Sequence, residues 1–185
     1  MPIIRRVAVP VVGLVLTGVA AFVWTSREPA PPPLPPLAVE TLSPPTGIDL
    51  PVRVVGHGER GDLYSFDAPV EGKQEETIVT VQLAPRPEWS QFGVVEEMPQ
   101  AGSLDEFTDR QRRHPADSHI AGDPVVEHSA LGDAVRKDLR MSANVTTTQW
   151  AVEHDGHLFV VEWMHSPDDP RRPTVEAMIA SWRWS

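Results

Sequence analysis

The fold is decided by one stretch, residues 147–165, which reads TTQWAVEHDGHLFVVEWMH. Two runs rich in β-branched and aromatic residues flank the dipeptide Asp155-Gly156, and such runs are typical of β-strands. A two-residue Asp-Gly loop favours a type I′ turn, because both of its central residues need a positive φ. We therefore predict an antiparallel hairpin with this turn at its tip.

The turn also fixes which residues of the two strands face each other. Because the loop holds two residues, pairing begins at the residues on either side of it. Four cross-strand pairs result: His154 with His157, Val152 with Phe159, Trp150 with Val161, and Thr148 with Trp163. One face of the hairpin is then aromatic and β-branched, and we predict that it faces the core. The opposite face is also largely apolar, so we predict that it is covered too.

Shorter apolar runs extend this pattern through the rest of the chain. Five of them are predicted to be strands: residues 52–55, 63–66, 77–83, 124–129 and 134–141. Glycine-containing turns separate the first two runs and the last two runs. Each of these pairs is therefore predicted to form a hairpin.

Two helices are predicted, one in the middle of the chain and one at its end. Ser103 followed by Glu106 is a capping box, and the pattern predicts a helix to about Arg113, before Pro115. In the second helix, Pro173 suits the first turn. Four apolar residues recur there at helical spacing: Val175, Met178, Ile179 and Trp182. The predicted fold class is α+β, with an antiparallel β-sheet flanked by helices.

An apolar run near the N-terminus begins at Val7 and ends at Trp24, and its eighteen residues carry no charge. As a helix it spans about 27 Å at 1.5 Å per residue, close to the ~30 Å hydrocarbon core of a bilayer. Arg5 and Arg6 precede the run, so the positive-inside rule places the N-terminus in the cytoplasm and residues 25–185 outside. We predict a retained single-pass transmembrane helix.

Cleavage of this run is the alternative interpretation. Val19-Ala20-Ala21 is an acceptable small-residue cleavage site, and cleavage after Ala21 would release a soluble secreted factor. The apolar run continues through Phe22-Val23-Trp24, beyond that site, which favours the retained helix.

A proline-rich segment follows the apolar run. Residues 25–51 contain nine prolines, which remove backbone donors and favour the extended polyproline II conformation. We therefore predict three parts. Residues 1–24 form a cytoplasmic start and the transmembrane helix, residues 25–51 form an extended linker, and residues 52–185 form an extracytoplasmic α+β domain.

Composition excludes several kinds of chemistry. The 185 residues include no cysteine, which rules out disulfides, zinc-thiolate sites, a thiol nucleophile and a lipid anchor on cysteine. The net charge of −10 argues against nucleic acid, because phosphates are bound by clustered Lys and Arg. No serine-hydrolase elbow, phosphate-binding glycine loop or His-Glu-x-x-His motif occurs. We therefore predict no catalytic residue, no cofactor and no enzyme activity.

The best candidate for chemistry is the pair His154 and His157 beside the hairpin turn. Their imidazoles lie on one face and could share Zn²⁺ or Cu²⁺, so a metal-assisted hydrolase is the alternative function. Two nitrogens are too few for a structural metal site, and a solvated turn with two histidines is the commoner arrangement. Trp89 and Trp184 are further ligand candidates. Paired carboxylates, the residues that acid–base catalysis uses, occur in two predicted loops: Asp168-Asp169 and Glu96-Glu97. Neighbours in sequence point in different directions, so neither pair is favoured as a catalytic site.

The order of these elements resembles a known family. The pattern comprises Ser103-Leu104-Asp105-Glu106-Phe107, Ala134-Val135-Arg136-Lys137, Gln149-Trp150-Ala151-Val152 and Met178-Ile179-Ala180-Ser181-Trp182. Over about residues 75–185 it resembles the LpqN-type extracytoplasmic proteins of actinobacteria, which share the fold of the photosystem PsbP subunit and of a Ran-binding nuclear import factor. The resemblance implies an antiparallel sheet sandwiched by helices and a non-catalytic binding or accessory role. This chain lacks the family's lipoprotein cysteine, and the helix at residues 7–24 would take over the anchoring.

Together these features predict a membrane-anchored, non-catalytic binding or accessory module of the bacterial cell envelope. Its predicted partners are the lipid bilayer, through the N-terminal helix, and an envelope protein or cell-wall component.

Overall fold

The computed structural model describes residues 32–59, 61–85, 88–97, 102–114 and 119–185. The predicted transmembrane helix at residues 7–24 and the cleavage site after Ala21 lie outside these residues. Within them, no helix combines the length and apolar character that crossing a bilayer requires. The chain divides at Pro36 into two units, and the fold below is that of residues 36–185 taken by itself.

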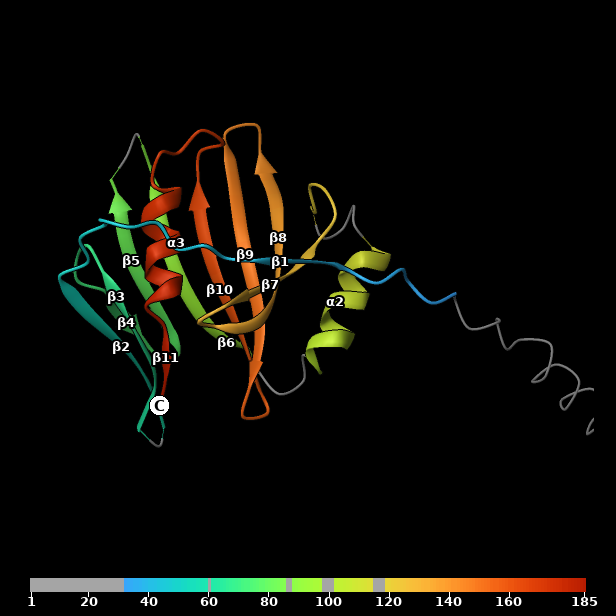
Figure 1. Ribbon diagram of the computed structural model, residues 1–185, viewed down its shortest axis with the longest axis horizontal. Helices are drawn as coiled ribbons and strands as arrows, with labels where there is room; N and C mark the ends of the chain where they lie inside the picture. Colours follow the sequence, from blue (N-terminus) through green and yellow to red (C-terminus); the bar gives the residue numbers. More distant parts are fainter. Residues whose placement is uncertain (1–31, 60, 86–87, 98–101, 115–118) are drawn as a thin grey trace, which may run out of the picture. The chain divides into compact units, whose positions relative to one another are not determined.

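An eight-stranded sheet forms the larger part of this unit (Figure 1). Its neighbouring strands are antiparallel, except that β1 and β7 run parallel. In spatial order the strands are β1 (Ala38–Thr41), β7 (Val125–Ser129), β8 (Gly132–Ser142), β9 (Val145–His154), β10 (His157–His165), β6 (Ser90–Glu97), β5 (Ile78–Ala84) and β4 (Lys73–Glu75).

A smaller sheet and two helices pack on the large sheet. The small sheet has the order β11 (Arg183–Trp184), β3 (Gly61–Ala68) and β2 (Val52–Gly58), and the helices are α2 (Leu104–Arg113) and α3 (Arg172–Ala180). The small sheet and α3 lie on the same face of the large sheet, where their apolar side chains share one core with those of β5, β6, β9 and β10 (Figure 1). The predicted α+β fold class is confirmed at this level, as a sheet-rich sandwich.

The central hairpin, β9 and β10, forms in the predicted register. His154 pairs with His157, and the three further predicted pairs follow along the strands. Asp155 and Gly156 have φ values of 49° and 77°, as a type I′ turn requires. The predicted core face is buried along its whole length: Trp150, Val152, Phe159, Val161 and Trp163. Alternation and turn chemistry therefore sufficed to place this hairpin.

The second face of the hairpin is covered in part by α2. Ser103 Oγ accepts from the Glu106 amide and Glu106 Oε2 accepts from the Ser103 amide, both at 3.2 Å, so the predicted capping box is present. The Leu104 amide at the helix start donates to Glu153 Oε2 on β9 at 3.2 Å. Lys137 Nζ of β8 lies 4.7 Å from the centre of the Phe107 ring. The two helices therefore pack on opposite faces of the large sheet.

Several elements differ from the predictions. Strand β1 lies inside the segment predicted as an extended linker, so regular structure begins before the predicted domain boundary at Val52. Strand β6 ends with Glu96-Glu97, which the prediction placed in a loop. Helix α3 ends at Ala180, so Trp182 is buried in the core from beyond the helix rather than from its last turn. Strands β4 and β11, of three and two residues, were also not predicted.

Candidate functional site

The core face of the large sheet changes character along its strands. Near the Asp155-Gly156 turn it is apolar, and beyond Trp150 it becomes polar. Two rows of paired residues cross β8, β9 and β10 there: Asp138, Thr148 and Trp163 in one row, and Arg140, Thr146 and His165 in the next. The start of α3 lies opposite these rows and contributes Arg172 and Glu176. A cavity of about 380 Å³ lies between these elements and is lined mainly by charged and polar side chains.

Glu127 of β7 is buried beside this cavity. Trp150 Nε1 donates to its Oε1 at 2.8 Å, and Arg136 Nε lies 2.9 Å from its Oε2 in an ion pair without hydrogen-bond geometry. Burial raises the pKa of Glu127 above its ordinary value of 4.5, because desolvation outweighs the hydrogen bond from Trp150 and the attraction of Arg136. Arg136 Nη2 also donates to Glu40 Oε2 of β1 at 2.6 Å, which ties β1 to this end of the sheet.

A second polar group contains Asp138, Thr148 and His165. Thr148 Oγ1 donates to Asp138 Oδ1 at 2.8 Å and lies 3.2 Å from His165 Nε2. His165 Nδ1 donates to the carbonyl of Ser166 at 2.7 Å, since a carbonyl oxygen can only accept. The acid thus contacts the hydroxyl rather than the imidazole, so the three groups do not have the order of a nucleophile, base and acid triad.

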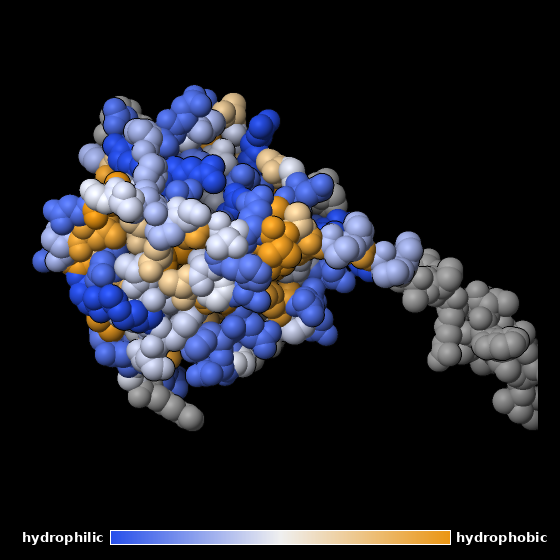
Figure 2. All heavy atoms as spheres, in the orientation of Figure 1, coloured by the Kyte–Doolittle hydropathy of each residue, from blue (hydrophilic) through white to orange (hydrophobic). Residues whose placement is uncertain are grey.

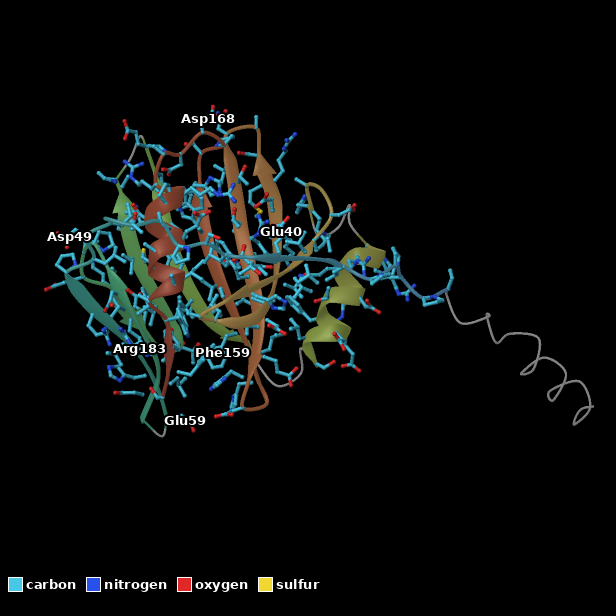
Figure 3. The ribbon with its side chains drawn as sticks, viewed as in Figure 1. Glu40, Asp49, Glu59, Phe159, Asp168 and Arg183 are labelled. Atoms are coloured by element: carbon cyan, nitrogen blue, oxygen red, sulfur yellow. The ribbon has the colours of Figure 1, made fainter. Side chains whose placement is uncertain are left out.

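Asp169, in the loop between β10 and α3, supplies a buried carboxylate. Its side chain is 1% exposed, and its Oδ1 accepts from the Arg171 amide at 2.9 Å and from Arg171 Nη1 at 3.1 Å. Its Oδ2 is buried and has no hydrogen-bond partner among the described residues. Such an oxygen is costly to bury, so it is a candidate contact for a ligand donor. The exposed neighbour Asp168 marks this loop in Figure 3.

Arg172 closes the cavity from the first turn of α3. Its Nε donates to Glu176 Oε1 at 2.8 Å, one helical turn later. This hydrogen bond raises the pKa of Arg172, and the charges of Glu176, Asp138 and Glu127 act in the same direction. The guanidinium therefore stays charged beside the acidic groups of the cavity.

The histidines singled out from the sequence lie elsewhere, beside the β9–β10 turn. The His154 ring stacks on Trp184 with centroids 4.2 Å apart, and its Nε2 lies 3.7 Å from Asp155 Oδ2. The centroid of the His157 ring lies 6.4 Å from that of the Phe159 ring. Throughout the part of the chain that the structure describes, no group of three His, Asp or Glu side chains is arranged to hold a metal ion.

The two tryptophan candidates do not lie together at a site either. Trp184 Nε1 donates to the Leu131 carbonyl at 3.0 Å, and its ring packs on Phe159 at 5.0 Å, so it completes the core. Trp89 is half-buried and precedes β6, and it does not line the cavity. The prediction named Asp169 only as one of a pair of loop carboxylates, and it missed the other cavity residues, above all Arg140. Their signal was present in part, since Arg136, Asp138 and Arg140 alternate along one strand.

One pH effect follows from the burial of Glu127. A carboxyl whose pKa is raised on folding adds stability below its unfolded pKa of about 4.5 and loses that contribution as the pH rises through its folded pKa. We expect Glu127→Gln to keep an acceptor for Trp150 and to remove this part of the pH dependence. Melting temperatures of both proteins from about pH 4 to 8 test this. Glu75→Gln, at an exposed position, is the control, and parallel curves for Glu127→Gln and the native protein would contradict the expectation.

Comparisons with known proteins do not assign this chain to a family. No protein-family description matches the sequence, and no curated protein is detectably similar to it. Among solved structures, a 1.50 Å crystal structure from Bacteroides thetaiotaomicron VPI-5482 is similar, with a TM-score of 0.43 and 12% sequence identity. The match covers 72% of this chain and 48% of the other, so this chain spans about half the length of that one. A likeness at this level carries no conclusion about function.

Proposed function

We propose that this protein is a single-pass protein of a bacterial cell envelope, and that residues 36–185 form a non-catalytic binding domain outside the cytoplasmic membrane. The cavity between α3 and the polar end of the large sheet is its ligand site. The observation that carries the binding role is the charged lining of the cavity, on a sheet face that is otherwise apolar core. The proposed location rests on the uncharged apolar run of the sequence from Val7 to Trp24. Charged groups at such a depth are unfavourable unless they are paired or serve a ligand.

Binding is favoured over catalysis by how the polar side chains contact one another. The hydroxyl of Thr148 is buried and directed to Asp138, and the imidazole of His165 is held by the Ser166 carbonyl and by stacking on Trp163 at 3.6 Å. The alternative, a metal-assisted hydrolase at His154 and His157, gains no support from their contacts with aromatic rings.

The proposal also includes the fold relationship suggested by the sequence. Two helices on opposite faces of a mostly antiparallel sheet suit the PsbP-like sandwich of the LpqN-type proteins. The binding or accessory role implied by that resemblance agrees with a domain that carries a cavity lined by charged side chains.

The surface around α3 supports a ligand site rather than a broad apolar docking face. Figure 2 shows that hydrophilic residues dominate this face and that hydrophobic residues form small separate groups. Large continuous apolar patches mark many protein-binding and membrane-binding surfaces, and the visible face of the described residues has none of that extent.

The absence of cysteine makes the location testable by single-cysteine labelling. We expect Asp168→Cys, at an exposed loop position, to react with a membrane-impermeant maleimide in intact spheroplasts. Ile3→Cys should react only after lysis, because the positive-inside rule places it in the cytoplasm. The native chain is the blank. Protection of Asp168→Cys until lysis would contradict the proposal, and recovery of a soluble chain that begins after Ala21 would replace the anchored form with the secreted one.

A further inference from the structure

The charged side chains of the cavity lie at different depths. The carboxylates of Glu127 and Asp169 lie at its floor, where their side chains are 6% and 1% exposed. The arginines Arg140 and Arg172 lie at its rim and are exposed. Arg136 also lies deep, with its side chain 17% exposed, but it is paired with Glu127, and Glu176 is paired with Arg172. The carboxylate of Asp169 therefore remains deep in the cavity, and the guanidinium group of Arg140 remains at its mouth.

At the floor of the cavity, carboxylate oxygens can accept more hydrogen bonds than the described residues donate to them. Asp169 Oδ2 is buried without a hydrogen-bond partner among the residues described, and the carboxylate of Asp138 receives a single hydrogen bond, from the Thr148 hydroxyl. An ammonium group has three donors and no acceptor, and its positive charge is stabilised by these carboxylates. An anionic group at the same depth would be repelled. The floor thus favours a primary ammonium.

At the rim of the cavity, most guanidinium N–H groups have no acceptor among the described residues. The guanidinium of Arg140 makes no hydrogen bond or ion pair within the described ranges, and Arg172 uses only its Nε, on Glu176. A guanidinium binds a carboxylate through two parallel hydrogen bonds. The rim thus favours an anionic group on the part of the ligand that remains nearest to solvent.

Other ligand classes fit less well. Trp150 and Trp163 are each 3% exposed, so their ring faces are not open platforms for a sugar. Their indole N–H groups are already used, by Glu127 and by Ser90. The volume of about 380 Å³ is at the small end of ligand sites, which suits a ligand the size of one or two amino acids.

We infer that the cavity binds a small zwitterion with one ammonium and one carboxylate group, as in an α-amino acid or a short peptide. The ammonium lies against Asp169 and Asp138, and the carboxylate lies against Arg140 and Arg172. This inference rests on the proposed function in that it takes the cavity as the ligand site.

Binding of five compounds to the full chain in mild detergent tests the inference by calorimetry. The probes are alanine in both enantiomers, alanyl-alanine, alaninamide, which lacks the carboxylate, and N-acetylalanine, which lacks the ammonium. We expect alanine or alanyl-alanine to bind at least about tenfold more tightly than either blocked derivative, because each blocked derivative loses one charge-assisted contact. The tighter of alanine and alanyl-alanine identifies the source as a free amino acid or a peptide.

Two substitutions separate the two ends of the ligand. Arg140→Gln is expected to weaken the binding of alanine or alanyl-alanine about tenfold and to leave that of alaninamide unchanged. Asp169→Asn is expected to weaken the binding of both alanine and alaninamide. Asp169 also accepts hydrogen bonds from Arg171, so its replacement can disturb the loop. Asp138→Asn is therefore a second substitution at the floor of the cavity, and circular dichroism checks the fold of each variant. Arg110→Gln, the same change on α2, is the matched control and should bind like the native chain.

Each outcome has a distinct meaning. The inference is overturned if no probe binds, or if a blocked derivative binds as tightly as the zwitterion. If alaninamide binds as tightly as alanine and Asp169→Asn or Asp138→Asn abolishes that binding, the ligand is a cation rather than a zwitterion, and the cavity remains the ligand site. If none of the cavity variants changes the binding of alanine or alanyl-alanine, the cavity is not the ligand site. The location of the domain is decided separately, by the labelling of Asp168→Cys.

Discussion

Phe66→Ala is expected to lower the free energy of unfolding by about 3–5 kcal/mol, the range found for truncation of a fully buried aromatic side chain. Phe66 is 0% exposed. Its ring stacks on Trp182 at 5.2 Å and meets the edge of Phe92 at 5.3 Å. It therefore joins the small sheet, the large sheet and the segment after α3 at one point, and no neighbouring side chain can fill its volume without leaving these contacts. Urea unfolding followed by tryptophan fluorescence measures the change.

Two further variants separate a cavity effect from a general loss of apolar surface. Phe66→Leu keeps most of the volume and should lower the free energy of unfolding by less than Phe66→Ala. Met141→Ala removes a side chain that is 53% exposed and should change it by no more than about 0.5 kcal/mol. If Phe66→Ala proved no more harmful than Met141→Ala, the two sheets would not share the core that this ring occupies.

The elements that could be predicted are those whose signal is local. The Asp155-Gly156 turn determines the register of β9 and β10 without help from the rest of the chain. The capping box of α2 involves only Ser103 and Glu106, which are three residues apart. In both cases the chemistry that specifies the element lies within the element, so the sequence is sufficient.

The elements that were missed depend on contacts between distant segments. Strand β1 follows a proline-rich stretch and has four exposed residues, and it is a strand only because it pairs with β7, more than eighty residues later. Strand β11 has two residues and exists through its pairing with β3. The sequence of strand β6 was partly typical of a strand, since the apolar residues Phe92 and Val94 are two positions apart and both are buried. Gly93 between them weakens that pattern.

The cavity could be predicted only in part. The register of the hairpin places Thr148 and His165 on the core face, and alternation along β8 places Asp138 and Arg140 beside them. What the sequence does not contain is the position of α3, which leaves space above these residues instead of packing on them. The burial of Asp169 likewise depends on how the loop folds back onto Arg171.

Gly56→Ala is expected to be the second severe substitution, because the backbone of Gly56 lies directly under an aromatic ring. Gly56 of β2 pairs with Tyr64 of β3. A Cβ at this position would lie 2.1 Å from Tyr64 Cζ and 2.5 Å from Cε2, well inside contact distance. The ring cannot move away freely, since it is buried and stacks on Trp182 at 4.7 Å. We expect a loss of about 1–3 kcal/mol in the free energy of unfolding, as for other overpacked cores.

A double-mutant cycle shows whether the clash with the ring causes this loss. Tyr64→Leu removes the ring atoms that the new methyl group would meet, so adding Gly56→Ala to Tyr64→Leu should cost at least about 1 kcal/mol less than adding it to the native chain. Gly93→Ala is the control for glycine replacement in a strand. Its Cβ would lie 3.6 Å from the Val79 carbonyl, an ordinary contact, and neither Gly56 nor Gly93 has a positive φ. An equal effect of Gly56→Ala in both backgrounds would mean that the ring does not lie over the glycine, and the packing of the small sheet would then have to differ from the arrangement described.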